Sequence, residues 1–184
     1  LTREEAVEVL NLPEEEMDSL MDVLMHFVQN IKGESKRSAS DKFRSGNCTQ
    51  NCAYCAQSKD SQAEIEKYKR VSDEKLYGDN DLVDEKHLAR HCIGLSGIGF
   101  SDEEIEDLAD RIREMKKKDT QICCSIGFLT EKQARILKDA GLDRINHNLN
   151  SSRSFYPEIC TTHTYDQRVN NIKMLQSLGF EICS

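Results

Sequence analysis

The chain has 184 residues, of which 32% are charged and 38% hydrophobic, and its formal net charge is −8. A compact chain of this length buries roughly 70% of its unfolded surface, which predicts one folded domain. The acidic balance argues against nucleic acid and anionic membranes as partners, because both bind basic patches. The sequence shows no membrane-spanning apolar run and no secretion signal, so its eight cysteines predict a reducing, cytoplasmic compartment.

Two helices are expected at the start of the chain. Thr2 and Glu5 have the spacing of a capping box before a helix that ends near Leu10, and Pro13 suits the first turn of a second helix. Apolar residues then recur at spacings of three and four, which predicts one buried face. They are Met17, Leu20, Met21, Leu24, Phe27, Val28 and Ile31. Residues 33–42 follow without a large apolar side chain, so they form either a solvated linker or a badly compromised first strand.

Three cysteines, Cys48, Cys52 and Cys55, stand in the segment SGNCTQNCAYCAQS at C-x3-C-x2-C spacing, with Tyr54 just before the last. Three thiolates hold three irons of a four-iron cubane cluster and leave one iron without a protein ligand. Catalytic metal sites keep such a position open for substrate. A structural zinc site is one alternative, although no cysteine or histidine follows Cys55 before His87. Disulfides are a second alternative, but nothing else in the sequence indicates secretion.

Strands and helices alternate in the rest of the chain. Residues 75–91 are polar, and their segment GDND is expected to break the crossover helix that belongs there. Beyond them the pattern predicts strands over 91–95, 121–126, 144–149 and 180–183, and helices over 102–118, 130–141 and 166–179. Helices of this length between strands indicate right-handed βαβ units on a parallel sheet. About four to five units are present, which predicts an α/β fold of the partial TIM-type (β/α) barrel class.

Alternation along each expected strand assigns its residues to two faces. Three asparagines of one strand and one cysteine from each of three strands fall on the polar face. They are Asn146, Asn148, Asn150, Cys92, Cys123 and Cys183. A polar barrel interior indicates a ligand cavity, because packing alone favours branched apolar side chains there. The alternative is that each cysteine is a small buried hydrophobe. His147 falls on the outer face, which favours a core role over catalysis.

The cysteine motif with its tyrosine resembles the signature of the radical S-adenosylmethionine (SAM) superfamily. The segments HCIGLSG, ICCSIGFL, INHNLNSS and TTHTYDQR, together with Cys183, are similar in order and context to the biotin synthase family. The resemblance extends over nearly the whole chain. It implies a helical extension over residues 1–33 and a partial radical SAM barrel over residues 34–184. The family's chain is expected to continue beyond Ser184.

The resemblance also implies the site residues. A 4Fe–4S cluster and a 2Fe–2S cluster would each be held by three cysteines, the second with an arginine beyond Ser184 as a further ligand. The implied metal ligands are Cys48, Cys52 and Cys55 for the first cluster, and Cys92, Cys123 and Cys183 for the second. The implied SAM-binding residues are Tyr54, Asn148 and Asn150. No catalytic side chain is implied, and Cys124 and Cys160 are interpreted as packing residues.

The implied function is insertion of sulfur into dethiobiotin to form biotin by way of a 5′-deoxyadenosyl radical. An electron donor such as flavodoxin or ferredoxin and a homodimeric assembly are implied with it. Two alternatives stay open. A related maturase or mutase would share the first cluster but not the second. A catalytically inactive chain would bind one cluster or none, and the two polar stretches and the absent arginine favour it.

Overall fold

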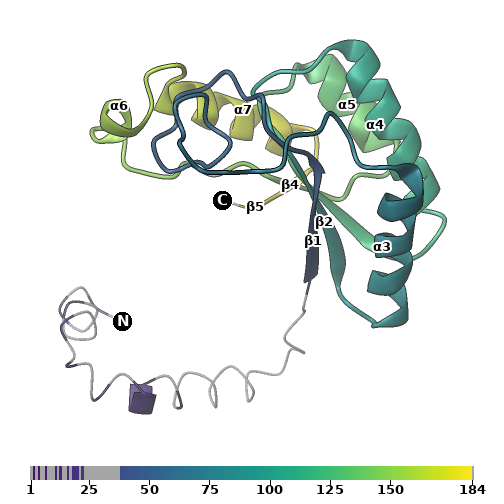
Figure 1. Cartoon of the computed structure of the whole chain (residues 1–184), viewed down its shortest axis with the longest axis horizontal. Coiled ribbons are helices and arrows are strands. Elements are labelled where there is room, and N and C mark those ends of the chain that lie inside the picture. The colour runs from purple at the N-terminus through teal and green to yellow at the C-terminus, as the bar shows by residue number, and fades with distance from the viewer. Residues whose placement is uncertain are drawn as a thin grey trace. The chain divides into compact units, whose positions relative to one another are not determined.

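The computed structural model describes residues 38–183 without a gap (Figure 1). Of the residues before these, it describes Thr2, Glu4, Val7, Asn11, Pro13, Glu16, 18–20 and Asp22. The chain divides into two compact units, Leu1–Lys36 and Arg37–Ser184. Most of the two helices expected near the N-terminus lies outside the described residues, so the boundary at residue 33 stays a prediction.

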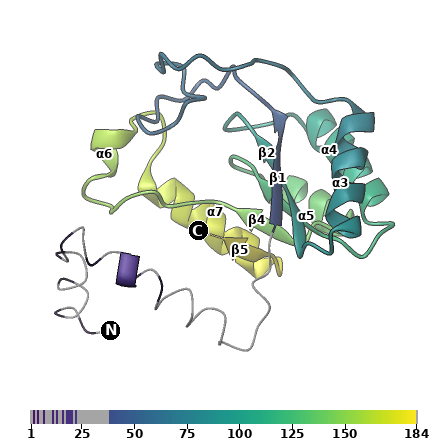
Figure 2. The same ribbon diagram turned by 60° about the horizontal axis from the view of Figure 1, so that its bottom comes forward.

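A parallel sheet of five strands forms the centre of the second unit, and its strands follow one another in sequence order. The strands are β1 (Ser38–Arg44), β2 (Arg90–Leu95), β3 (Gln121–Ser125), β4 (Arg144–Asn146) and β5 (Glu181–Cys183). The crossover helices are α3 (Asp73–Glu85), α4 (Asp102–Met115), α5 (Glu131–Asp139) and α7 (Tyr165–Ser177), and a short α6 (Tyr156–Ile159) precedes α7. Figures 1 and 2 show α3, α4 and α5 together on one side of the sheet. The α/β prediction is confirmed, and within the described residues the sheet is not closed into a barrel.

The helices start where their capping residues stand. Ser101, Thr130 and Thr164 each accept a hydrogen bond from a backbone N–H in the first turn, and each forms a full capping box. One such cap contributes about 1 kcal/mol. Behind the caps, Ile105 and Leu137 are fully buried against the sheet face that carries Ile122 and Ile145. Each buried side chain of this size contributes roughly 1.5–3 kcal/mol, so the helix side of the sheet is the apolar core.

A first strand forms within the polar stretch 33–42, so the solvated-linker alternative is wrong for residues 38–42. β1 pairs in parallel with β2 from Ser38 onward. Its polar side chains find partners on neighbouring elements: Asp41 Oδ2 lies 3.1 Å from Nε2 of the buried His91. Phe43, at 5% exposure, is the strand's one large contribution to the core. Backbone pairing and a polar partner replace the apolar run that a parallel strand usually shows.

The GDND segment does not break its helix, contrary to the expectation from sequence. α3 runs through it without interruption from the N-cap Ser72. Leu76 and Val83, each 1% exposed, anchor the turns on either side. Asn80 is buried as well, with Nδ2 donating to the carbonyl of Met115 at 3.4 Å. Tertiary packing on both sides therefore outweighs the weak helix propensity of glycine, asparagine and aspartate.

Candidate metal and cofactor site

The loop between β1 and α3 crosses the carboxyl edge of the sheet and carries the three-cysteine motif (Figure 2). Ser45 and Tyr68 exchange backbone hydrogen bonds of 3.1 and 3.0 Å, which close the base of the loop. Gly46 follows with φ 78°, a conformation that favours glycine. At its far side the N–H of Ala53 donates to the carbonyl of Ile159 at 2.9 Å. The motif is thus fixed between the sheet edge and the segment before α7.

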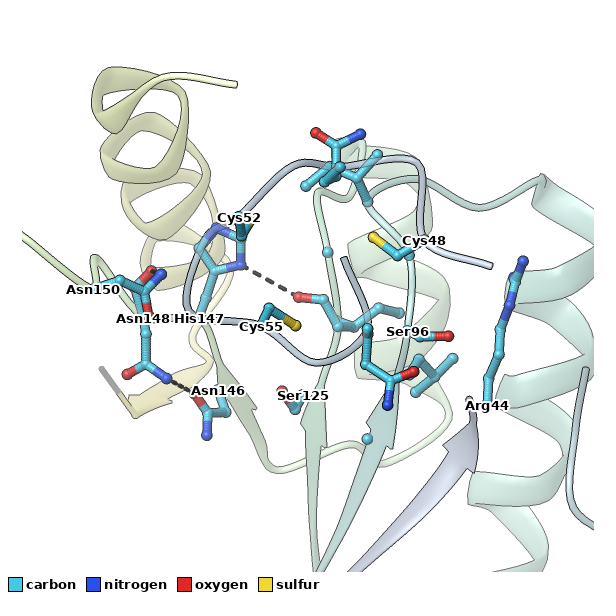
Figure 3. Close-up of a pocket in the computed structure, with 18 of the residues that line it drawn as sticks. Arg44, Cys48, Cys52, Cys55, Ser96, Ser125, Asn146, His147, Asn148 and Asn150 are labelled. Atoms are coloured by element: carbon cyan, nitrogen blue, oxygen red, sulfur yellow. Dashed lines mark hydrogen bonds between the residues drawn. The ribbon is translucent and has the colours of Figure 1, made fainter. Parts of the chain in front are cut away.

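All three cysteines of the motif line a cavity of about 310 Å³ at this edge (Figure 3). Cys48 and Cys55 are half-buried, whereas Cys52 is buried. The N–H of Cys55 donates to the carbonyl of Cys52 at 3.1 Å, so a tight turn brings these two residues together. Burial, and after it the neighbouring Cys160, raises the pKa of Cys52 to about 11. Cys52 is therefore a thiol at neutral pH, and metal binding would release its proton.

The three residues predicted to bind a cofactor lie together on the same cavity wall. Asn150 Nδ2 donates to Tyr54 Oη at 2.7 Å. Asn148 Nδ2 donates to Asn146 Oδ1 at 2.9 Å (Figure 3). The strand expected over 144–149 ends at Asn146, so strand alternation does not place the other two asparagines. They reach the cavity through a turn in which Asn150 has φ 65°, a conformation that asparagine tolerates.

Arg168 lines the cavity and had no assigned function in the sequence interpretation. Its Nη1 donates to the carbonyl of Asn148 at 2.9 Å, and its Nη2 lies 3.0 Å from His163 Nε2. Burial first, and then the Arg168 charge, lowers the pKa of His147 and of His163 to about 4. A signal for Arg168 existed in the sequence, because the first turns of a helix after a parallel strand begin at the carboxyl edge, where barrel sites form.

His147 is 2% exposed and its Nδ1 lies 3.3 Å from the carbonyl oxygen of Ile126. Its Nε2 has no hydrogen-bond partner among the described residues. The side chain is packed as a core residue would be, and it also forms part of the cavity wall.

The second predicted set of cysteines lies on one face of the sheet. Cys92 is the direct neighbour of Cys123 in the β2–β3 register, Cys123 pairs with Arg144, and Asn146 pairs with Cys183. Paired residues, and residues two apart on one strand, share a face. The contact with Cys92, followed by burial, raises the pKa of Cys123 far above its usual range. A polar, sulfur-bearing face thus lies opposite the apolar helix face.

The two cysteines without a predicted function differ in their surroundings. Cys124 is fully buried in the apolar core, and burial raises its thiol pKa, as expected of a packing residue. Cys160 Sγ lies 3.7 Å from Cys52 Sγ. Burial alone would raise the pKa of Cys160, but hydrogen bonds with Thr162, the backbone of His163 and Cys52 together outweigh it, and the net shift is downward.

A family model described as Radical SAM superfamily matches residues 44–184. A biotin synthase from Bacillus subtilis is 38% identical over 186 residues, which cover 100% of this chain and 56% of that protein. A biotin synthase from Acaryochloris marina is 44% identical over 143 residues, which cover 77% of this chain and 41% of that protein. The chain thus spans about half the length of these relatives.

Two solved structures share the fold. The FeFe-hydrogenase maturase HydG from Carboxydothermus hydrogenoformans superposes with a TM-score of 0.67 at 21% identity, covering 80% of this chain and 36% of that one. Methylornithine synthase PylB does so with a TM-score of 0.67 at 14% identity, covering 81% of this chain and 44% of that one. At these identities the likeness extends to the fold alone.

Among the described helices, none combines the length and the apolar character needed to cross a membrane.

Proposed function

The chain belongs to the radical SAM superfamily, and on that basis we propose that it is a biotin synthase-like sulfurtransferase that inserts sulfur into dethiobiotin. Superfamily membership implies a 4Fe–4S cluster and SAM. The single observation that carries the proposal is that the three-cysteine motif opens onto the same cavity as Tyr54, Asn148 and Asn150. The similarity to biotin synthases supports the choice of substrate.

The donor set fits the implied cluster. Cys48, Cys52 and Cys55 offer three thiolates on one loop, which leaves one iron for SAM. When bound, the cluster and SAM supply a one-electron cleavage that yields a 5′-deoxyadenosyl radical. Tyr54 and Asn150, already hydrogen-bonded to each other, would hold the nucleoside. The cavity wall would exclude water, which protects a reactive species from side reactions.

Asn148 would contact both SAM and dethiobiotin. Its carbonyl is held by Arg168 and its side chain by Asn146, so its orientation is fixed before any ligand arrives. Such preorganisation lowers the cost of placing two reactants at attack distance. The substrate is therefore expected between the asparagines and the sulfur-bearing face of the sheet.

Cys92, Cys123 and Cys183 would hold a 2Fe–2S cluster that serves as the sulfur donor. Their common face and the direct pairing of Cys92 with Cys123 support this assignment. Arg144, beside Cys123 in the ladder, is ion-paired with Glu181 on β5, so it brings no uncompensated charge to this face. The electron donor, such as flavodoxin or ferredoxin, the homodimer and the cytoplasmic location stay predictions.

Anaerobic reconstitution with iron and sulfide tests the first cluster. We expect about four irons at the motif, with SAM cleavage to 5′-deoxyadenosine when dithionite is added. Cys48→Ser and Cys55→Ser should lose both, and Cys160→Ser, outside the motif, should keep both. Unchanged iron content in Cys48→Ser and Cys55→Ser would refute the assignment.

The second cluster is tested by comparing the wild type with Cys92→Ser. A loss of about two irons, together with sulfur transfer to dethiobiotin by the wild type, would support the sulfurtransferase. Equal iron contents would favour a maturase or mutase that has the first cluster alone, or an inactive chain.

A further inference from the structure

Cys52 has a second group of neighbours, outside the three-cysteine motif. Its Sγ lies 3.7 Å from Cys160 Sγ, which lies 3.3 Å from His163 Nδ1. One ligand atom from each of the three residues lies within 4.8 Å of the others. Their exposed fractions are 7%, 3% and 6%, in chain order. Two sulfurs and an imidazole thus converge in a nearly closed place.

Two of the three spacings between these atoms match a tetrahedral metal site, and the third is no more than 4.8 Å. Bonds of about 2.3 Å to sulfur and about 2.0 Å to nitrogen place two sulfurs about 3.8 Å apart, and a sulfur and a nitrogen about 3.5 Å apart. The distances from Cys160 of 3.7 Å and 3.3 Å lie within a few tenths of an ångström of these values. We propose that Cys52, Cys160 and His163 form a binding site for Zn²⁺ or another thiophilic divalent cation.

The charges around the group select the kind of ion. Two thiolates would neutralise a divalent cation, and sulfur and imidazole ligands favour zinc-like ions over Mg²⁺ or Ca²⁺. The nearby neutral oxygens include Asn51 Oδ1 and Thr162 Oγ1, each 3.5 Å from Cys160 Sγ, and Gln50 Oε1, 3.0 Å from His163 Nδ1. One of these oxygens, or a water, would complete four-fold coordination.

Arg168 couples this site to the cavity. In the metal-free chain its guanidinium approaches His163 Nε2 at 3.0 Å, so Nε2 accepts and the ring proton is on Nδ1. Coordination through Nδ1 would move that proton to Nε2, which then donates to Tyr156 Oη, 2.9 Å away. Arg168 would lose its contact with the ring but keep its bond to the carbonyl of Asn148.

Cys52 cannot serve this site and the three-cysteine motif at once. A cation held here would therefore exclude the cluster, and cluster assembly would have to displace the cation. This consequence rests on the proposed function, whereas the cation site itself does not. The two sites need different residues besides Cys52: Cys160 and His163 for the cation, Cys48 and Cys55 for the cluster.

Cobalt titration of the reduced, iron-free chain under argon tests the proposal, because Co²⁺ reports tetrahedral thiolate ligation by its visible absorption. We expect one Co²⁺ with tetrahedral bands, bleached by one equivalent of Zn²⁺. Cys160→Ser and His163→Ala should weaken Co²⁺ binding at least about tenfold. Zn²⁺ should also raise the melting temperature of the wild type and not that of Cys160→Ser.

Cys48→Ser and Cys55→Ser are the matched controls, and both should keep the wild-type cobalt spectrum and affinity. A spectrum that survives Cys160→Ser unchanged, or that disappears in Cys48→Ser, would overturn the proposal. Far-UV circular dichroism establishes that each variant is folded before it is scored. Because iron reconstitution depends on Cys48 and not on Cys160, failure of the cation site is distinguishable from failure of the cluster site.

Discussion

Gly127 marks a place where the loop after β3 passes directly over the loop after β2. A Cβ at Gly127 would lie 2.4 Å from the carbonyl oxygen of Ile98 and 2.6 Å from its carbonyl carbon and Cα. All three are backbone atoms, so no side chain can swing aside. The N–H of Phe128 also donates to the Ile98 carbonyl at 2.6 Å, which holds the loops together. The perturbation to make is Gly127→Ala.

The magnitude follows from the distances. Ordinary contact begins at 3.4 Å, so one loop must move by about 1 Å, and overpacking of this kind costs about 1–3 kcal/mol. Gly97 and Ile98 line the cavity, so the displacement reshapes the wall that faces the cysteine motif. Gly99→Ala is the matched control, because nothing lies within 4 Å of a Cβ there.

Urea unfolding measures the loss of stability, and SAM titration of the reconstituted protein measures the effect of the altered cavity wall on ligand binding. We expect Gly127→Ala to lose about 1–3 kcal/mol and to bind SAM at least about tenfold more weakly, with iron content unchanged. Gly99→Ala should stay within about 0.5 kcal/mol of the wild type. Equal urea midpoints for the two variants would refute the close-approach argument.

Three further changes test separate parts of the fold by urea unfolding. Gly78→Ala should stabilise the chain by about 1 kcal/mol, because this exposed residue inside α3 has nothing within 4 Å of its missing Cβ; an unchanged midpoint would contradict this. Thr130→Ala should cost about 1 kcal/mol by removing the α5 capping box, and Thr130→Ser should restore most of it. In the folded chain the pKa of His147 is lowered from 6.5 to about 4. Its contribution to the free energy of unfolding is therefore full above pH 6.5 and is lost as the pH falls toward 4. Between pH 7 and pH 5 the titration of His147 should lower the free energy of unfolding by about 2 kcal/mol, and His147→Gln should not show this loss. An identical pH dependence in that variant would rule this out.

The helix starts and the strand order could be predicted because both depend on local signals. Ser101 and Thr130 stand just before apolar stripes, and each forms a capping box at the start of its helix. The parallel order follows from helices of regular length between strands. The helix ends were less exact: α4 stops at Met115 rather than near residue 118, because the apolar stripe ends there and only lysines follow.

β1 could not be predicted, because what stabilises it lies far along the chain. The partner of Asp41 is His91, fifty positions away, and the strand that β1 pairs with is β2. α3 shows the same limit, since Asn80 is helical through contacts with α4 and β2 that no local pattern reveals. Helix and strand propensities depend on the segment alone. Where they are weak, contacts with distant parts of the chain decide which secondary structure forms.

The candidate site shows a different limit. Spacing within the loop predicts three thiolates, but it does not reveal that Cys160, 108 positions beyond Cys52, reaches the same sulfur. Strand alternation predicts the three asparagines on one wall, although only Asn146 is in a strand. Asn148 and Asn150 lie beyond the strand, and hydrogen bonds with Arg168 and Tyr54, respectively, hold them at the cavity.

Cys52 belongs to the three-cysteine motif and also contacts Cys160, which affects how a cluster would be assembled. A buried thiol whose pKa is raised to about 11 loses its proton at neutral pH only when a strongly binding metal ion displaces it. Cys48 and Cys55 are half-buried and reach solvent, so iron can meet them first, whereas Cys52 must turn from Cys160 to complete the set. That turn breaks a contact between two sulfurs and leaves Cys160 beside His163. Binding of the last thiolate is thus expected to be the slow step of assembly. Cys160→Ser should make the slow phase of stopped-flow iron uptake faster while leaving the final iron count unchanged.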